Sequence, residues 1–91
     1  MMCRVERGTV ARSAAGRDKD RFFVVMKTEG AFAWICDGKG RPIDRQKRKK
    51  IMHLRPTGTR VDPDTLTTDR QIRNFLRAFA EGEGDRRSEA R

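Results

Sequence analysis

The sequence predicts a mostly β fold, a small β-barrel followed by one C-terminal α-helix, and three observations lead to this prediction. Short stretches rich in β-branched and aromatic residues recur at a spacing of about 8–12 residues, with glycine-containing turns between them. A single apolar stripe at helical spacing follows near the C-terminus. The chain has 91 residues, which suffices for one small domain with a thin core.

The first three strands follow from local pattern. We expect a strand at about Thr9 to Ser13, where apolar and polar residues alternate after a glycine. The stretch "RFFVVMKT", 21–28, has the residue types that strands favour, and "AAGRDKD" before it is a turn. The pair "EG", 29–30, predicts a tight turn into "AFAWIC", 31–36. This arm buries either its even positions, with Phe32, Trp34 and Cys36, or its odd positions, with Ala33 and Ile35.

Turn and strand signals continue on both sides of a basic run, residues 45–50. The stretch "DGKG", 37–40, predicts a turn. We expect short strands at "RPID", 41–44, and at "IMHL", 51–54, on either side of "RQKRKK", 45–50. As a sheet edge, that run fits a strand protected by charge against aggregation as well as a binding surface.

The C-terminal third predicts a linker and a helix. Two prolines mark "RPTGTRVDPDTLTTD" as a surface linker, and Thr68 or Asp69 can cap the helix that follows. The apolar stripe of this helix should dock on the barrel, and Gly82 should end it. The predicted organisation is a barrel over 1–57, a linker over 58–68, a helix over 69–81 and a disordered tail over 82–91. The stripe consists of Ile72, Phe75, Leu76 and Phe79, whereas Arg70, Arg73 and Arg77 lie on another face.

The charge is distributed unevenly along the chain. Residues 1–60 hold 16 Lys and Arg against 6 Asp and Glu, a net charge of +10, whereas residues 61–91 carry a net charge of −1. A basic domain of this kind favours a polyanionic partner, with nucleic acid first and an anionic membrane surface second. The chain is too small for a deep enzyme pocket, and we expect no catalytic activity.

Several other classes of protein are not expected. The longest apolar run, 22–26, is too short to span a membrane, and the N-terminus lacks the apolar region of a secretory signal, so we expect a cytoplasmic protein. Cys3 and Cys36 are then expected to be reduced, inert thiols. We expect no metal and no cofactor, because one histidine and no C-x-x-C pair make a poor zinc site, and because the Asp residues lie in turns beside Lys or Arg. His53, between apolar neighbours, is expected to be structural.

The stretch "GTVARSAAGRDKDRFFVV", 8–25, resembles the KOW motif of ribosomal proteins and of NusG-type elongation factors. With the "DG" at 37–38 and "KKIMHL" at 49–54, the chain over about 6–57 is similar to KOW domain-containing RNA-binding proteins, relatives of large-subunit ribosomal proteins of archaea and eukaryotes. Where that family often has glycine after the lysine, this chain has Asp20, a residue type that tolerates left-handed backbone.

This resemblance implies an SH3-like barrel that binds RNA. We expect ribosomal RNA or the ribosome as the partner, and a monomeric protein with no small-molecule substrate. Basic loops on a rigid barrel suit the phosphates of a folded RNA. The expected contacts are Arg12, Arg17, Lys19 and Arg21 in the KOW loop; Lys39 and Arg41 at the "DGKG" turn; and Arg45, Lys47, Arg48, Lys49 and Lys50 in the basic run.

Two alternatives remain open at this point. The chain could be a protein-interaction module that docks on the ribosome or the transcription machinery through its helix arginines, and its charge also permits DNA binding. Trp34 and the phenylalanines are expected in the core. Phe32, beside the turn, is the aromatic residue that could instead stack on unpaired bases.

Overall fold

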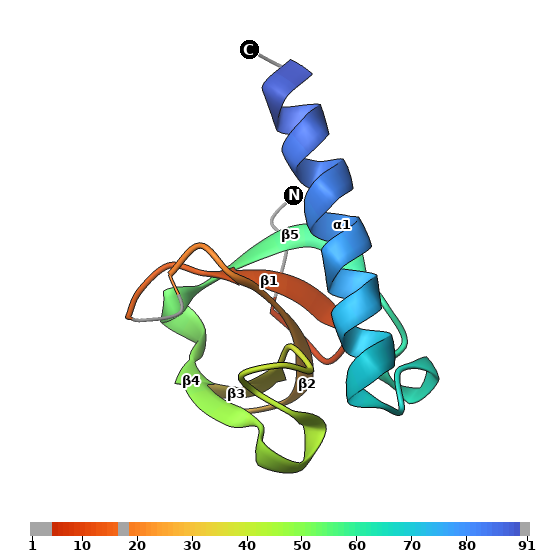
Figure 1. Cartoon of the computed structure of the whole chain (residues 1–91). Coiled ribbons are helices and arrows are strands. Elements are labelled where there is room, and N and C mark those ends of the chain that lie inside the picture. Colours follow the sequence, from red (N-terminus) through yellow and green to blue (C-terminus); the bar gives the residue numbers. More distant parts are fainter. Residues whose placement is uncertain (1–4, 17–18, 90–91) are drawn as a thin grey trace.

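The computed structural model of the chain describes residues 5–16 and 19–89, the last nine of these as backbone only. A five-stranded antiparallel sheet, in the order β4-β3-β2-β1-β5, and a C-terminal helix, α1 (Asp69–Glu89), account for most of the described chain (Figure 1). The sheet curves strongly around an interior, and α1 lies against its outside. These features confirm the mostly β class and the C-terminal helix. Within the described residues no ladder joins β4 to β5, so the sheet is open.

The strand predictions are confirmed for the first three strands and need correction beyond them. The strands are β1 Thr9–Ser13, β2 Phe22–Glu29, β3 Phe32–Cys36, β4 Lys47–Lys50 and β5 Leu54–Arg60. The strand expected at 41–44 is instead a 3₁₀ turn, η1 (Ile43–Arg45), which follows the fixed backbone of Pro42. The strand expected at 51–54 is mostly a second 3₁₀ turn, η2 (Ile51–His53), because the chain must pass here from one edge of the sheet to the other.

The predicted linker, 58–68, is also corrected. It begins as part of β5, which pairs with β1 up to the Thr9–Arg60 pair, and Thr57 Oγ1 donates a 2.7 Å hydrogen bond to the Val10 carbonyl oxygen. Pro56 is compatible with this strand because β5 is an edge strand and needs no donor there.

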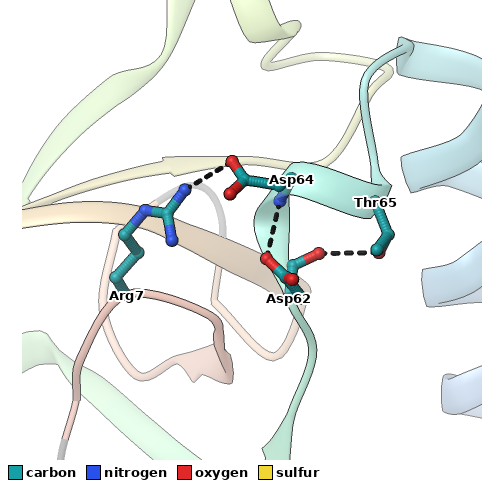
Figure 2. Close-up of polar contacts among 4 residues, drawn as sticks. All are labelled: Arg7, Asp62, Asp64 and Thr65. Atoms are coloured by element: carbon teal, nitrogen blue, oxygen red, sulfur yellow. Dashed lines mark hydrogen bonds and ion pairs between the residues drawn. The ribbon is translucent and has the colours of Figure 1, made fainter.

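A polar network fixes the segment between β5 and α1 (Figure 2). The short turn η3 (Pro63–Thr65) is capped by Asp62, whose Oδ1 accepts from the Asp64 N–H at 3.0 Å and whose carbonyl accepts from Thr65 Oγ1 at 2.7 Å. Arg7 donates a 2.8 Å hydrogen bond to Asp64 Oδ1, across 57 positions of sequence. The segment before β1 and the segment after β5 are thereby joined.

The helix α1 spans Asp69–Glu89 and begins with a capping box. Thr68 Oγ1 accepts from the Gln71 N–H at 3.2 Å, and Gln71 Oε1 accepts from the Thr68 N–H at 3.1 Å, so Thr68 is the cap. The helix does not end near Gly82, and the predicted disordered tail is helical to Glu89. A glycine within a helix costs about 1 kcal/mol relative to alanine, and the Glu and Arg residues around it favour helix.

Two apolar clusters share the central strands. Val10, Val24 and Cys36 face outwards and pack against Leu66, Ile72 and Leu76, with Phe22 and Phe79 in edge-to-face contact at 5.2 Å between ring centroids. A second cluster fills the interior of the curved sheet and consists of Ala11, Phe23, Val25, Ala33, Ile35 and Leu54. Because successive residues of a strand point to opposite faces, β2 is apolar on both sides, which explains the uninterrupted run from Phe22 to Met26.

Candidate functional site

The charged turn between β1 and β2 is held at its base by the backbone. The Ser13 carbonyl oxygen accepts from the Asp20 N–H at 2.7 Å, and the Ser13 N–H donates to the Arg21 carbonyl at 2.9 Å. Asp20 has φ of +71°, and no other non-glycine residue of the described chain has a positive φ. Asp20 therefore adopts the left-handed backbone that its residue type tolerates. Lys19 is exposed, and Arg17, which we expect to bind RNA, lies outside the described residues.

Lys49 anchors this turn from β4, a strand at one edge of the sheet. Its side chain is buried, with 8 % of the residue exposed, and its Nζ donates a 2.9 Å hydrogen bond to the Ala15 carbonyl oxygen. Gly16, the next residue, lies so close that an added Cβ would sit 3.6 Å from the same Nζ. Lys49, which we expect to contact RNA, is therefore buried in this structure, and its ammonium group is bound to the backbone of the turn that it supports.

The strand pairing of β4 divides the rest of the basic run. Trp34 pairs with Arg48 and Phe32 with Lys50, on the outer face, whereas Ala33 pairs with Lys49 and Ile35 with Lys47, on the inner face. Arg48 and Lys50 are exposed, whereas Lys47 is half-buried. The run therefore does not present its charges as one block.

The "DGKG" loop is organised by the Asp37 carboxylate. Asp37 Oδ1 accepts from the backbone N–H groups of Lys39 at 2.9 Å and Arg41 at 2.8 Å, an Asx turn of the kind that aspartate favours. Its Oδ2 lies 3.6 Å from Arg21 Nη2, which brings the charged turn next to this loop. Arg73 of α1 donates a 2.7 Å hydrogen bond to the Gly38 carbonyl oxygen, so the loop also contacts the helix.

A basic groove forms where these three segments meet. Its cationic side chains are those of Arg21, Lys39, Arg73 and Arg77, and its remaining lining comprises Phe22, Asp37, Leu76 and Ala80. Arg21, Lys39 and Arg77 are exposed, and Arg77 Nη2 donates to Asn74 Oδ1 at 3.2 Å. Four cations beside one carboxylate over a partly apolar floor can hold an anion at the surface without enclosing it.

Sequence reasoning places these four cations on two different surfaces. It predicts that Arg21 and Lys39 bind RNA, whereas it assigns Arg73 and Arg77 to a possible protein-docking face of the helix. The structure brings them together because Gly38 allows the loop to approach α1: a Cβ at this position would collide with the Asp69 carbonyl oxygen. The helical period alone places Arg73 and Arg77 beside Leu76 and Ala80, but not next to the loop.

The other predicted contacts lie outside the lining of this groove. Arg12 is half-buried on β1, between Phe22 of β2 and Arg55 of β5. Arg45 is exposed at the end of η1, and Arg41 is half-buried in the loop that Asp37 organises. The predicted site residues that the structure describes thus lie on β1 and the charged turn, in the groove and its loop, and along η1 and β4.

The side chains of Phe32 and Trp34 lie outside the core. The sequence predicts Trp34 in the core, whereas Phe32 is the aromatic residue considered for exposure. Both are half-buried on the outer face of β3, beyond the part that α1 covers. Lys27 Nζ lies 4.6 Å from the Trp34 ring centroid, and Arg48 Cζ lies 4.6 Å from the Phe32 ring centroid. Such exposed cation–π contacts are individually weak, at about 0.5–1 kcal/mol.

Cys36 and His53 both have roles in the structure of the fold. Burial, and then the charges of Asp69 and Asp37, raise the pKa of the Cys36 thiol to about 12, which makes it inert near neutral pH. The carbonyl oxygen of His53 accepts from the Ala14 N–H at 2.8 Å, so this residue joins η2 to the segment after β1 through its backbone. Cys3 lies outside the described residues.

Neither a metal cluster nor a membrane helix is present in the part of the chain that the structure describes. Among its side chains, no group of three His, Cys, Asp or Glu residues is placed to hold a metal ion. Within the same residues, no helix has the length and apolar character needed to cross a membrane. In comparisons with known proteins, no family model matches the chain and no curated protein matches it.

Proposed function

We propose that the chain is a non-catalytic RNA-binding protein of the KOW type, which holds structured RNA through basic side chains around its charged turn. Ribosomal RNA is the target that the KOW resemblance favours, and a cytoplasmic location follows from that target. The observation that carries the proposal is the basic groove, in which Arg21 and Lys39 meet Arg73 and Arg77.

The fold supports the KOW part of this proposal. Five antiparallel strands curve around one interior, and a 3₁₀ turn connects the two edge strands, as in a partly open SH3-like barrel. The charged turn connects β1 to β2, as the KOW resemblance requires, and Asp20 adopts the left-handed backbone that glycine supplies in that family.

The chemistry of the groove suits phosphate better than a protein partner. Guanidinium groups bind phosphate oxygens in bidentate fashion, and a shallow basic surface can follow a nucleic-acid backbone. The alternative, a protein-docking helix face, needs Arg73 and Arg77 to act separately from the charged turn. Their position beside Arg21 and Lys39 favours one anion-binding surface instead.

The test is the salt dependence of RNA affinity in groove variants. The double variant Lys39→Gln, Arg77→Gln removes two exposed cations from the groove and leaves the hydrogen bond between Arg73 and the Gly38 carbonyl oxygen in place. We expect weaker binding to a folded ribosomal RNA fragment. The log–log salt slope should fall by about 0.7–0.9 for each phosphate that the variant no longer neutralises.

The matched control is Arg70→Gln, which removes an exposed helix cation outside the groove lining. It should leave the slope almost unchanged. Affinity of the unmodified protein that stays flat between about 50 and 200 mM salt would overturn the proposal. Equal affinity for a DNA duplex of the same length would show that the groove binds nucleic acid in general and does not select RNA.

A further inference from the structure

The outer face of the sheet is divided between α1 and an uncovered region. In β3, Phe32, Trp34 and Cys36 share one face, and α1 covers it only around Cys36, Val24 and Val10. Phe32 and Trp34 remain half-buried next to solvent, with the rings supported by the sheet. We call this uncovered region, made of Phe32 and Trp34 with the cations around them, the aromatic platform.

Cations surround both rings of the platform. Lys27 pairs with Trp34 from the β2 side and lies over its ring, and Arg48, paired with Trp34 from the β4 side, lies over the Phe32 ring. Lys50 pairs with Phe32, and the acidic neighbour is Glu29, at the turn. Three cations to one carboxylate give the platform a positive charge.

We propose that the aromatic platform binds unpaired nucleotides of the RNA by base stacking, with Lys27 and Arg48 moving from the rings to the adjacent phosphates. Every nucleobase has a flat π-face that stacks on aromatic rings or on a guanidinium plane, and the backbone beside it needs cations. Stacking a base on a ring contributes more to affinity than the exposed cation–π contact that the ring loses, so replacing the cation by a base is favourable. The inference rests on the proposed RNA binding and specifies its target: a duplex or folded region flanked by a single strand.

The platform and the basic groove can bind the same RNA molecule. Trp34 precedes Asp37 by three residues along β3 and the start of its loop, a distance of about 10 Å in extended backbone. The groove is lined in part by α1, and the platform lies on the same outer face of the sheet, beyond the part that α1 covers. A single strand that leaves a duplex held in the groove therefore reaches Phe32 and Trp34.

The chain contains its own reporter for this test, because Trp34 is its one tryptophan and it has no tyrosine. A base that stacks on the indole quenches its fluorescence. We expect saturable quenching by oligouridine or oligoadenosine single strands. A blunt RNA duplex of the same length should bind through the groove and leave the fluorescence almost unchanged.

Affinities measured with labelled RNA separate this inference from the proposed function. Phe32→Leu, which keeps an apolar cover on the sheet, should weaken single-strand binding about tenfold and leave duplex binding unchanged. Trp34→Phe, which keeps an aromatic ring, should retain most of the affinity that Trp34→Leu loses. Met52→Ala, which alters a side chain on η2 that is 72 % exposed, should change neither affinity.

The outcomes of these experiments distinguish failure of the aromatic platform from failure of the proposed RNA binding. Single-strand and duplex binding that both survive Phe32→Leu and Trp34→Leu, without quenching, would overturn the platform and leave the groove intact. Failure of the unmodified protein to bind either RNA at low salt would overturn the proposed function, and the platform with it. Thermal melting of each variant checks that it is folded.

Discussion

Lys49 Nζ donates a 2.9 Å hydrogen bond to the carbonyl oxygen of Ala15, 34 positions away in the sequence. The hydrogen bond joins β4, at one edge of the sheet, to the charged turn between β1 and β2. A lysine in the middle of a basic run is thereby used for structure, whereas its neighbours Arg48 and Lys50 are exposed. The shape of the charged turn therefore depends on a strand that is not adjacent to it in the sheet.

Replacement of Lys49 should affect stability before it affects binding. We expect Lys49→Met to lower the free energy of unfolding by about 1–2 kcal/mol, because a charged donor to a backbone acceptor is removed while the aliphatic stem is kept. Denaturant unfolding followed by circular dichroism measures the change. Lys50→Met, on the exposed side of the same strand, is the control and should change stability by less than about 0.5 kcal/mol. An equal loss of stability in both variants would contradict the anchoring role.

At position 20, glycine should preserve the stability of the fold, whereas a β-branched residue should lower it. The φ of Asp20, +71°, is in the left-handed region, so Asp20→Val should destabilise the fold by about 1–2 kcal/mol. Asp20→Gly should be neutral or slightly stabilising, and it also removes a negative charge from the turn, so RNA affinity should rise. Asp20→Asn separates the two effects, because it removes the charge and keeps a residue type that tolerates this backbone. Thermal melting and RNA titration of the three variants provide the measurements.

Gly38 should be the glycine whose substitution most disturbs the groove. Gly38→Ala introduces a Cβ that collides with the Asp69 carbonyl oxygen, and the φ of +75° adds backbone strain. We expect a loss of more than about 2 kcal/mol in the free energy of unfolding, because the loop must move away from α1. Gly40→Ala is the matched control, since a Cβ there meets nothing within 4 Å. A Gly38→Ala protein as stable as Gly40→Ala would show that the loop does not pack tightly on the helix.

The raised pKa of Cys36 predicts a pH dependence of stability at the alkaline end. The folded thiol titrates near pH 12 and the unfolded thiol near pH 9, so its contribution is fully present below about pH 9 and is lost as the pH rises towards 12. The difference in unfolding free energy between the unmodified protein and Cys36→Ala should shrink over this window. The comparison removes the background from lysine and arginine titration, which both proteins share.

The same burial predicts low thiol reactivity. In a Cys3→Ser background, a thiol reagent at pH 8 should label Cys36 only in step with unfolding, and denaturant should make labelling immediate. Rapid labelling of the folded protein would show that Cys36 is accessible.

The elements set by local pattern are predictable from the sequence. The alternation around Val10, the β-branched run of β2 and the helical stripe from Ile72 to Phe79 all have the structures expected. The end of α1 is not predictable in this way, because Gly82 ends a helix only if its backbone turns left-handed, and the residues around it favour helix.

The candidate site is only partly predictable. Residue type identifies Arg21 and Lys39, but a basic run read as letters does not reveal that alternation in β4 turns Lys49 inwards. The groove depends on a tertiary contact, the approach of the Gly38 backbone to α1, that no local signal encodes. Trp34 is expected in the core because large aromatic residues usually are, and the sequence does not show where the helix stops covering the sheet.

The double-sided burial of β2 has a consequence for cooperativity. Val24 belongs to the cluster under α1 and Val25 to the cluster inside the sheet, so one strand contributes to both. Loosening either cluster releases the strand that the other needs, and the helix cannot separate without weakening the interior of the sheet. The β-sheet and the turns of α1 that pack on it should therefore unfold in a single transition. The amide hydrogens of β2 should be among the slowest to exchange with solvent.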